Sequence, residues 1–591
     1  MAGNTSDDHT PNPAPRDKGG AQTGRPTWPI ERAVPGVAWI RAYRRADLRH
    51  DLIAGLTLAA VILPIAMAYG QLAGLPPIAG VYASILPLVA YALFGSSPRL
   101  IIGPDASTAA LVAAAILPLA GANSAHAMAL AAGLALLVGL MSLAAGFARL
   151  GFIADFLSKP ILVGYVIGLA LTIIAGQLGK VFGIPIASDD FFRQIAELVM
   201  RLPETNLPSL AIGASVLALI VILRRVAPRV PAPLLAVVGA TIAANIFHLD
   251  ARGVATIGAI PPGLPAPRIP PVSLGELAAM LPGALGITLL TFSDTILNAR
   301  TFATRQGVTV HASGELIGLG AGNLAAGLTQ GFPVSGSGTR TAVNEAAGGR
   351  TQLAGVLAAL TLSLILVFLT DPLSHFPTAA LGGALIAVVL PLLDAAELRH
   401  LYYLRRRESA VALVTTLSVL TVGLLPGLAI AVTLSFLLLL ARAVRPHDAV
   451  LGKIPGLDGY HDIGDYPESE RAPGLLVYRF DGPLFFANAS YFKSRVLALA
   501  EELDPPLRWF ILDAEAITDI DSTALEALEE VRQRLTVQGA VFAIARAKSA
   551  LRERLERAGL ADAIGLDRIY PSIRTAVAGY AADIGDVDSE P

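Results

Sequence analysis

Residues 103–115 read "GPDASTAALVAAA" and residues 331–349 read "GFPVSGSGTRTAVNEAAGG", two short segments that open with glycine and proline and continue with small and hydroxyl side chains. Each segment is too short to cross a bilayer as one helix, because a span needs roughly 20 apolar residues. Short segments broken by Gly and Pro at corresponding places in two halves of a chain are typical of transporters that bind their cargo at midmembrane. These two segments therefore predict a fold built from two repeats.

The composition is that of a polytopic membrane protein. The 591 residues are 54% hydrophobic and 15% charged, and the mean hydropathy is +0.61. No cysteine is present, which excludes disulfides and thiolate sites for metals or catalysis. Neither a nucleotide-hydrolysing motif nor a His, Asp and Glu set with metal-ligand spacing is evident. We therefore expect neither an enzyme nor a bound cofactor, and no nucleic acid as a partner.

Fourteen apolar stretches predict fourteen spans. They begin near Leu52, Ile78, Asp105, His126, Pro160, Leu207, Pro233, Met280, Ala312, Ser337, Leu353, Ala379, Ala410 and Gly427. The offset between the two short segments resembles that from Pro64 in the first span to Asp294 in the eighth. The sequence thus predicts two repeats of seven spans. An odd number of spans per repeat makes them inverted.

Basic residues predict the orientation in the membrane. They fall on alternate loops: Arg41, Arg44, Arg45 and Arg49; Arg99; Arg149 and Lys159; Arg224, Arg225 and Arg229; Arg300 and Arg305; Arg350; Arg399, Arg405, Arg406 and Arg407. By the positive-inside rule both termini are cytoplasmic, and we expect the chain in the cell (inner) membrane. The long connection between Lys180 and Pro208 contains "DDFFRQIAELVMRL", which predicts an amphipathic helix on the outer surface.

Composition changes predict five regions. A polar tail (1–36), a transport domain (37–446), a linker (447–473), a small α/β domain (474–583) and an acidic tail (584–591) follow one another. The first tail is rich in Pro and Gly, which predicts disorder. Strand and helix patterns alternate in the fourth region, which predicts a small α/β sandwich.

The two half-helices predict an anion site. Helix N-termini that meet at midmembrane present free N–H groups and a partial positive charge. Arg340, in the second segment, adds a full positive charge; the alternative is an anchor to a backbone carbonyl or to Asp294. Asp294, with Asn298 four residues on, is suited to bind a proton or Na⁺; the alternative is a salt bridge to Arg340.

Asp105 follows a Gly-Pro pair at the start of the first half-helix. One reading is a carboxylate that caps the helix. The other is a coupling group, because an ionised Asp105 would compete with the anion for the same N–H groups, whereas a protonated one would not. We therefore place Asp105 beside Asp294 as a candidate for proton coupling.

Several stretches resemble the SulP family of anion transporters. They are "DLIAGLTLAAVILPIAMAYGQLAGLPPIAGVYAS", "YALFGSSPRLIIGP", "FLSKPILVGYVIG", "GFPVSGSGTRTAVNEAAGGRTQLAGV" and "DIDSTALEAL". The resemblance implies fourteen spans in two inverted repeats, a uracil-permease-like core and gate, and a homodimer. It implies an anion between the half-helices, with Ala106, Ser107, Thr108, Ser337, Gly338, Thr339 and Arg340 around it. Asp294 resembles the coupling residue, with Asn298 and Gly336 near it; Gly336 is also a plausible turn glycine.

Two positions depart from the family's pattern. Many members carry Gln after the proline of the first span, where this chain has Ile65. The pocket thereby loses a polar contact, which puts recognition of sulfate-like anions in doubt. Many members also have an apolar residue in place of Asp105.

The C-terminal domain resembles a STAS domain, which implies a cytosolic regulatory partner. Thr523 falls on the hydroxyl that is phosphorylated in anti-sigma factor antagonists, so it is a candidate phosphorylation site. The alternative is a capping box, because Thr523 and Glu526 have the S/T-x-x-E spacing that begins a helix.

Together these features predict a secondary active transporter of a small inorganic or organic anion: sulfate, bicarbonate, dicarboxylate or chloride. We expect coupling to H⁺ or Na⁺ and elevator-type alternating access. The alternatives are a nucleobase permease of the same fold and a membrane sensor that signals through its STAS domain.

Overall fold

The computed structural model describes residues 34, 36–121, 123–151, 159–188, 190–227, 230–304 and 310–587. The N-terminal tail through residue 33, the basic residues Arg229 and Arg305, and the last four residues lie outside this part of the chain. The chain divides into two compact units, Met1–Thr433 and Leu434–Pro591.

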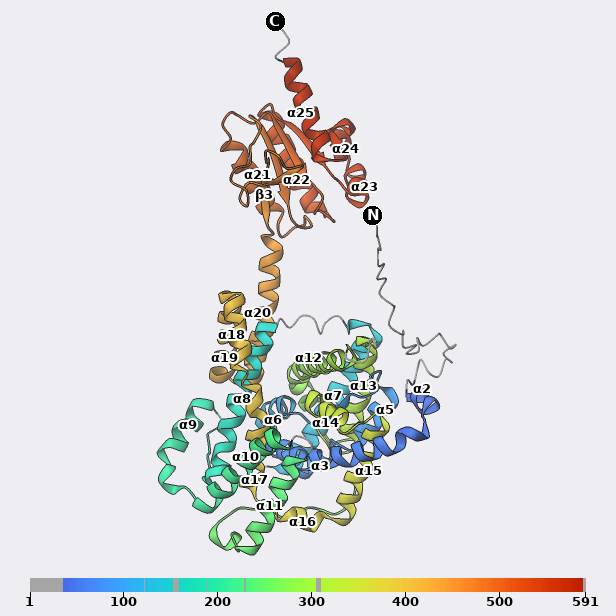
Figure 1. The fold of residues 1–591 in the computed structure, drawn as a ribbon, viewed down its shortest axis with the longest axis vertical. Helices are drawn as coiled ribbons and strands as arrows, with labels where there is room; N and C mark the ends of the chain where they lie inside the picture. Colours follow the sequence, from blue (N-terminus) through green and yellow to red (C-terminus); the bar gives the residue numbers. More distant parts are fainter. Residues whose placement is uncertain are drawn as a thin grey trace, which may run out of the picture. The chain divides into compact units, whose positions relative to one another are not determined.

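The first unit is helical (Figure 1). Its helices are α2 (Gly36–Ala42), η1 (Arg45–Asp47), α3 (Leu48–Leu72), α4 (Ile78–Tyr82), α5 (Leu86–Phe94), α6 (Ala106–Ala120), α7 (Ser124–Phe147), α8 (Lys159–Phe182), α9 (Phe191–Met200), η3 (Leu202–Glu204), α10 (Leu207–Val226), α11 (Ala232–Ile246), η4 (Asp250–Arg252), α12 (Leu274–Thr304), α13 (Ala312–Leu328), α14 (Gly338–Ala346), α15 (Leu353–Phe368), α16 (Thr370–Ser374), α17 (Thr378–Val389), η5 (Leu390–Leu392), α18 (Ala395–Leu404), α19 (Arg406–Val422) and the start of α20 (Leu424–Val444). Two short strands, β1 (Ile101–Gly103) and β2 (Ser335–Ser337), lie among them.

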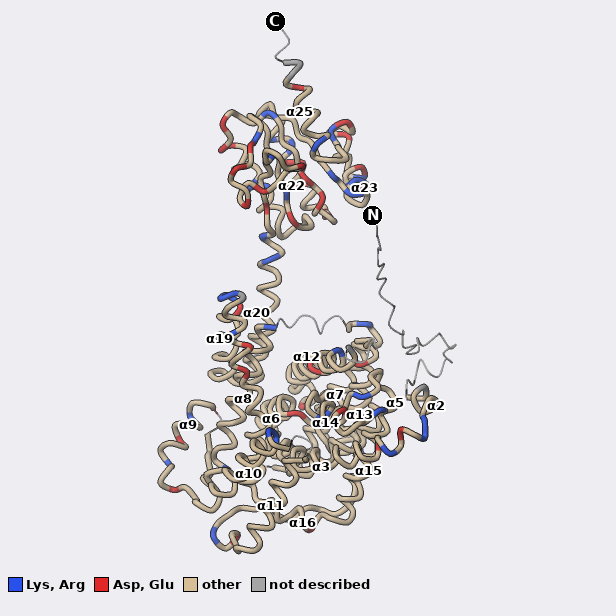
Figure 2. Tube along the Cα trace, viewed as in Figure 1, with Lys and Arg blue, Asp and Glu red and all other residues tan. Residues whose placement is uncertain are grey.

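Each of the fourteen predicted spans coincides with a helix of the structure. Within the described residues, seven helices are long and apolar enough to cross a membrane, and four further apolar helices are shorter. The number fourteen therefore stays a prediction, while a multi-span helical unit is what the structure has. Figure 2 shows that charged residues are sparse along these helices and gather at their ends. The amphipathic helix predicted after Lys180 forms as α9.

The two quoted segments form half-helices, as predicted. α6 has 15 residues and α14 has 9. At 1.5 Å per residue they measure about 22 and 14 Å, well short of a hydrocarbon core of about 30 Å. α3 is the most buried candidate span, with 72% of its apolar window inside the unit, and it contacts both half-helices.

The second unit has a six-stranded sheet in the order β4-β3-β5-β6-β7-β8. Its strands are β3 (Asp448–Lys453), β4 (Tyr460–Asp462), β5 (Leu475–Phe480), β6 (Trp509–Asp513), β7 (Val541–Ala545) and β8 (Ile569–Tyr570). Its helices are α21 (Ala489–Glu501), α22 (Ser522–Val537), α23 (Ser549–Arg557), α24 (Leu560–Ile564), η6 (Leu566–Arg568) and α25 (Ile573–Val587). Side chains of α21 to α24 pack on one face of the sheet and those of α25 on the other, as the predicted sandwich requires.

The region 447–473, predicted as a linker, holds two strands of this sheet. β3 pairs antiparallel with both β4 and β5, whereas β5 to β8 are parallel. Ala449, Val450 and Leu451 are buried because β3 lies between two strands with its faces covered. The apolar run is only a few residues long and precedes a stretch rich in Gly, Pro and Asp. It therefore gives a weak strand signal in the sequence.

Candidate functional site

A two-stranded ribbon joins the half-helices. β1 and β2 pair antiparallel, with Ile101 opposite Ser337 and Gly103 opposite Ser335. Each strand is followed within a few residues by a half-helix, so the ribbon brings the N-termini of α6 and α14 together while the helices run in opposite directions. The residues predicted from the two repeats therefore lie at one place in the fold.

Side chains cap both half-helices. Asp105 is the N-cap of α6, and its carboxylate accepts hydrogen bonds from the N–H of Ser107 at 3.3 Å and from the Ser107 hydroxyl at 2.9 Å. Ser337 is the N-cap of α14, where its hydroxyl accepts from the N–H of Arg340 at 3.4 Å. Of the two readings of Asp105, the helix cap is therefore present, and the role in proton coupling stays a prediction.

Arg340 carries a buried charge into this site. Arg340 is 3% exposed, and its Nη2 donates a hydrogen bond to the carbonyl oxygen of Pro104, at the start of the other half-helix. Its Nη1 has no hydrogen-bond partner among the described residues, and no ion pair joins it to Asp294. A Cβ at Gly103 would collide with this same Nη1, so only glycine lets the guanidinium approach the ribbon. The anchor to a backbone carbonyl is therefore present, but it uses only part of the guanidinium.

The small and hydroxyl-bearing residues of the two half-helices differ in their exposure. Thr108 is fully buried, and its Oγ1 has no partner among the described residues; the same holds for the buried hydroxyl of Ser335. Ala106 is buried, whereas Gly338 is partly exposed and Thr339 is exposed. The second half-helix is therefore the more accessible side of the site.

A cavity of about 290 Å³ lies beside α3 and α14. Its lining residues are Ile53, Thr57, Val61, Val230, Pro231, Val343, Ala346 and Ala347. Val343 and Ala346 lie four and seven residues after Thr339, which places the three on one face of α14. The cavity therefore follows the helix face that begins at the predicted anion site.

Asn298 and Gly336 are in contact, and Asp294 lies one helical turn before Asn298 on α12. The Asn298 Nδ2 donates to the Gly336 carbonyl oxygen at 3.0 Å, and the Gly336 N–H donates to the Thr295 hydroxyl at 2.9 Å. A Cβ on Gly336 would lie 2.9 Å from the Cα of Thr295. Gly336 is thus required by its close approach to α12 rather than by a turn. No hydrogen bond or ion pair engages the Asp294 carboxylate within the described part of the chain.

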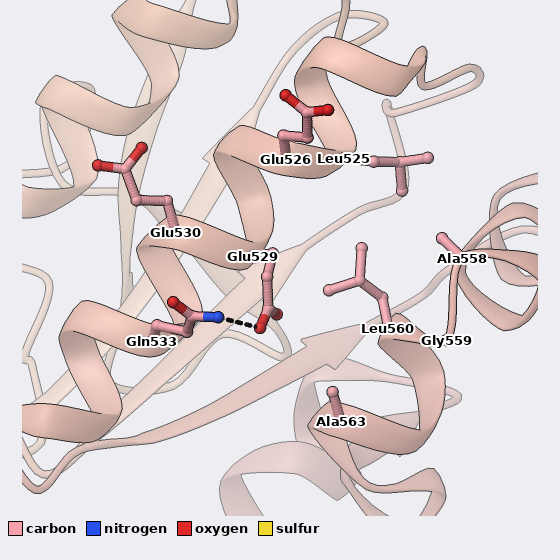
Figure 3. A pocket seen from close by; sticks show the side chains of 9 residues that line it. All are labelled: Leu525, Glu526, Glu529, Glu530, Gln533, Ala558, Gly559, Leu560 and Ala563. Carbon is pink, nitrogen blue, oxygen red and sulfur yellow. Dashed lines mark hydrogen bonds between the residues drawn. The ribbon is translucent and has the colours of Figure 1, made fainter.

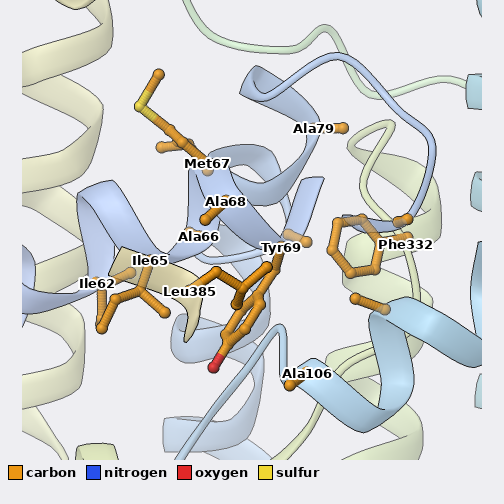
Figure 4. Close-up of a cluster of buried hydrophobic side chains, with 14 of the residues drawn as sticks. Ile62, Ile65, Ala66, Met67, Ala68, Tyr69, Ala79, Ala106, Phe332 and Leu385 are labelled. Carbon is orange, nitrogen blue, oxygen red and sulfur yellow. The ribbon is translucent and has the colours of Figure 1, made fainter. Parts of the chain in front are cut away.

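Ile65 lies in the buried cluster that faces this site, and the same cluster contains a residue that the sequence analysis missed. Tyr69, one helical turn after Ile65, is 4% exposed and belongs to α3 (Figure 4). Ala106 from α6, Phe332 and Leu385 from α17 share this cluster. The i, i+4 spacing from Ile65 was the signal that could have found it.

Two buried acids were also missed. Glu315 of α13 is fully buried and accepts hydrogen bonds from the Tyr91 and Ser96 hydroxyls, both at 2.5 Å. Asp51 of α3 is fully buried and accepts from the backbone of Arg350 at 2.7 Å and from the Thr351 hydroxyl at 2.7 Å. Both carboxylates are satisfied by structural partners, which distinguishes them from Asp294.

The arrangement suits an anion. Two helix N-termini supply N–H groups and partial positive charge, and Arg340 supplies a full charge with a free N–H. Burial strengthens each of these interactions, because the local dielectric constant is lower than that of water.

The model of the sulfate permease family matches residues 48–415. The chain belongs to this family. A STAS domain model matches residues 466–576. Over 555 residues the chain is 47% identical to a probable sulfate transporter of Mycobacterium tuberculosis, covering 94% of this chain and 99% of the relative. It is 31% identical to the chloroplastic sulfate transporter 4.1 of Arabidopsis thaliana, covering 93% of this chain and 82% of that protein.

Solved structures support the fold. The murine anion transporter Slc26a9 in its inward-facing state has a TM-score of 0.87 at 22% identity, covering 95% of this chain and 97% of that one. The transmembrane domain of the cyanobacterial bicarbonate transporter BicA has a TM-score of 0.59 at 23% identity, covering 67% and 98%. The predicted fold class, a helical membrane transporter core with a STAS domain, is confirmed.

The start of α22 differs from the prediction. Asp521, not Thr523, is the N-cap: its Oδ1 accepts from the Ala524 N–H at 2.9 Å, and its Oδ2 from the Phe486 N–H at 2.8 Å. The capping box of Thr523 and Glu526 is therefore wrong, because the aspartate two residues earlier occupies the cap position. Thr523 is exposed in the first turn, and its phosphorylation stays a prediction.

The STAS unit has a groove of about 430 Å³ (Figure 3). It is lined by Leu525, Glu526, Glu529, Glu530, Gln533, Ala558, Gly559, Leu560 and Ala563. A hydrogen bond from Arg532 lowers the pKa of Glu529, and one from Lys493 lowers the pKa of Glu530. Both carboxylates are thus ionised at neutral pH. Thr523 does not line this groove.

Proposed function

We propose that this chain is a secondary active transporter of a small anion, with sulfate as the first candidate. The observation that carries the proposal is the buried Arg340, whose free Nη1 lies where two helix N-termini converge. An unpaired cation inside a membrane protein is costly, so such residues generally serve a ligand or a pathway. Sulfate comes first because two relatives are named as sulfate transporters.

The anion would lie between the starts of α6 and α14. There the free N–H of Arg340 and the Thr108 hydroxyl, which also lacks a partner, are available as donors. Ile65 offers no polar contact, but Tyr69 on the same face of α3 offers a phenolic hydroxyl. We propose Tyr69 as the residue that replaces the missing polar contact, and Ser107, Ser337, Gly338 and Thr339 as the remaining wall.

Coupling to protons is the second part of the proposal. The Asp105 carboxylate accepts from Ser107 at the N-terminus of α6, which is where an anion would bind. A proton on Asp105 would remove the repulsion and release the Ser107 donors for the anion. Asp294 has no hydrogen-bond or ion-pair partner among the described residues and is the other proton acceptor; Asn298, one helical turn later, donates to Gly336. Na⁺ in place of H⁺ is the alternative.

The proposal includes elevator-type alternating access, both termini in the cytoplasm, the inner membrane as location and a homodimer. It also includes a cytosolic partner for the STAS unit. The sparse charge of the helical unit and its seven long apolar helices support insertion in a bilayer.

Uptake into proteoliposomes tests the proposal. Labelled sulfate, bicarbonate, fumarate and uracil are offered with no gradient, with an inward proton gradient and with an inward Na⁺ gradient. We expect saturable uptake of one anion that a proton gradient accelerates. Uptake of uracil alone would make the chain a nucleobase permease. A folded protein that moves none of the four, yet binds a cytosolic protein, would be a sensor.

Two substitutions test the coupling. Asp294→Asn and Asp105→Asn each remove an ionisable group while keeping its size. If both acids carry the coupling proton, each variant keeps anion exchange but loses its response to the proton gradient. An unchanged gradient response in one variant removes that residue from the coupling mechanism. Glu315→Gln is the control, because it also removes a carboxylate within the helical unit, but one that is fully buried and satisfied by two hydroxyls.

A further inference from the structure

Lys180 is a cation within the helical unit whose hydrogen-bond partner, Gln71, is neutral. It lies near the end of α8, and its Nζ donates to the Gln71 Oε1 at 3.3 Å. No ion pair to Lys180 occurs among the described residues. Its stem packs against α17, because a Cβ on Gly382 would lie 3.4 Å from the Lys180 Cβ. Lys180 thus links α8 and α17 to the end of α3.

A single amide is a poor partner for this side chain. An ammonium group has three N–H donors and one full charge. Removing it from water is costly unless a counter-charge compensates. Lys180 is half-buried and has only the Gln71 oxygen, so it would bind an anion more strongly than it binds its present partner.

The contact lies at the end of α3 that is remote from the cavity. Thr57 lines the cavity and Gln71 holds Lys180. The two residues are separated along α3 by about 21 Å at 1.5 Å per residue. α3 begins beside the basic residues Arg44 and Arg45, and α8 begins at Lys159 on another basic loop. Lys180 and Gln71 are therefore at the ends of their helices opposite the basic loops, which we call the far side.

We propose that the Lys180–Gln71 hydrogen bond is a latch that keeps the far side closed while the cavity is open, and that Lys180 binds the incoming anion when the latch opens. The inference rests on the proposed transport of an anion. Movement of α3 away from α8 would break the bond, uncover an unpaired ammonium, and so place a positive charge at the far mouth. The anion and Gln71 then compete for the same Nζ.

The chain contains no cysteine, which permits a clean accessibility test. Ala346→Cys places one thiol in the cavity lining, and a membrane-impermeant maleimide reports how often the cavity is open. Gln71→Leu removes the acceptor and keeps Lys180. Loss of one hydrogen bond shifts such an equilibrium by about fivefold, so we expect labelling of Ala346→Cys to slow by that factor.

Transport kinetics test whether Lys180 binds the incoming anion. In oriented proteoliposomes, Lys180→Met should raise the KM for anion on the far side by about tenfold, the effect of losing one charge-assisted contact. The comparison is with Gln71→Leu, because Lys180→Met also removes the latch, and the KM on the cavity side should be the same in these two variants. Lys180→Arg should restore the far-side KM, and Lys159→Met, the same change at the other end of α8, should leave it unaltered.

Each outcome has one reading. Slower labelling in Gln71→Leu together with a raised far-side KM in Lys180→Met supports the inference. Unchanged labelling overturns the latch. An unchanged far-side KM in a folded Lys180→Met variant overturns the anion-binding role. If the parent transports no anion, the proposed function fails, but the labelling of Ala346→Cys still decides whether the latch exists.

Discussion

Arg340 is the residue whose replacement should weaken anion binding most. Arg340→Gln removes the charge, and we expect it to lose the contact of the free Nη1 with the anion. The helix N-termini remain in this variant, so binding should be reduced rather than abolished.

The magnitude follows from the burial of the guanidinium. Two unit charges 4 Å apart interact by about 4 kcal/mol at an effective dielectric constant of 20, which is an upper limit for the loss. A hydrogen bond that involves a charged group contributes about 1.5–3 kcal/mol. Because 1.4 kcal/mol corresponds to a factor of ten, we expect the Kd to rise roughly 10- to 100-fold. Arg340→Lys keeps the charge but loses the planar pair of donors, so its Kd should lie between those of the parent and Arg340→Gln.

Calorimetric titration of the purified protein measures this change in Kd, with the anion that the proteoliposome uptake experiment identifies. Arg99→Gln is the matched control, because Arg99 is only half-buried and donates to the backbone carbonyl of Arg350 at 3.5 Å. A thermal unfolding curve shows whether each variant is folded. A folded Arg340→Gln protein that binds the anion as tightly as the parent would make Arg340 a strut for Pro104 and would refute the reasoning.

Three further predictions concern a packed glycine, a buried ion pair and a helix cap. Gly336→Ala forces a Cβ against the backbone of α12 and should lower the free energy of unfolding by about 1–3 kcal/mol. Gly239→Ala is the control, because a Cβ there meets no other atom within 4 Å, and thermal unfolding compares the two variants. Asp513→Asn breaks the ion pair between the fully buried Asp513 carboxylate and Arg546, and it should destabilise the STAS unit by about 2–3 kcal/mol in urea unfolding. This loss is smaller than for a fully buried ion pair, because the Arg546 side chain is 32% exposed. Asp521→Ala should cost about 1 kcal/mol in the same assay, and an equal cost for Thr523→Val would restore the rejected capping box.

The sequence was most informative where backbone chemistry decides the structure. The Gly-Pro pair before Asp105 predicted a helix start, and the structure has that start with Asp105 as its cap. The second quoted segment was likewise predicted to be too short to cross a bilayer, and its helix, α14, has 9 residues. Such signals are local, so they can be read without knowing the partners.

Features that depend on tertiary partners were missed or misplaced. The spacing of Tyr69 from Ile65 puts both on one face of α3, but that this face packs against α6 and α17 is a tertiary property that no local pattern records. β3 forms because β5 lies beside it, although its own apolar run is short. Asp521 and Thr523 both fit a helix cap by residue type, and the choice depends on the contact of Asp521 with Phe486. The free Nη1 of Arg340 is also a tertiary property, since it results from what surrounds the guanidinium.

The β1–β2 ribbon sets a minimum time for the assembly of the site, because its two strands are made far apart in time. Arg340 and its partner Pro104 are 236 residues apart in sequence, and the strands that bring them together are as widely separated. At 5–20 residues per second, synthesis of the intervening chain takes roughly 10–50 s. During that interval the residues of α6 and its cap, Asp105, have been made, but β2 and Arg340, which complete the site, have not. The site is therefore among the last parts of the helical unit to form, and the first repeat must persist with an unpaired strand until the second has been made.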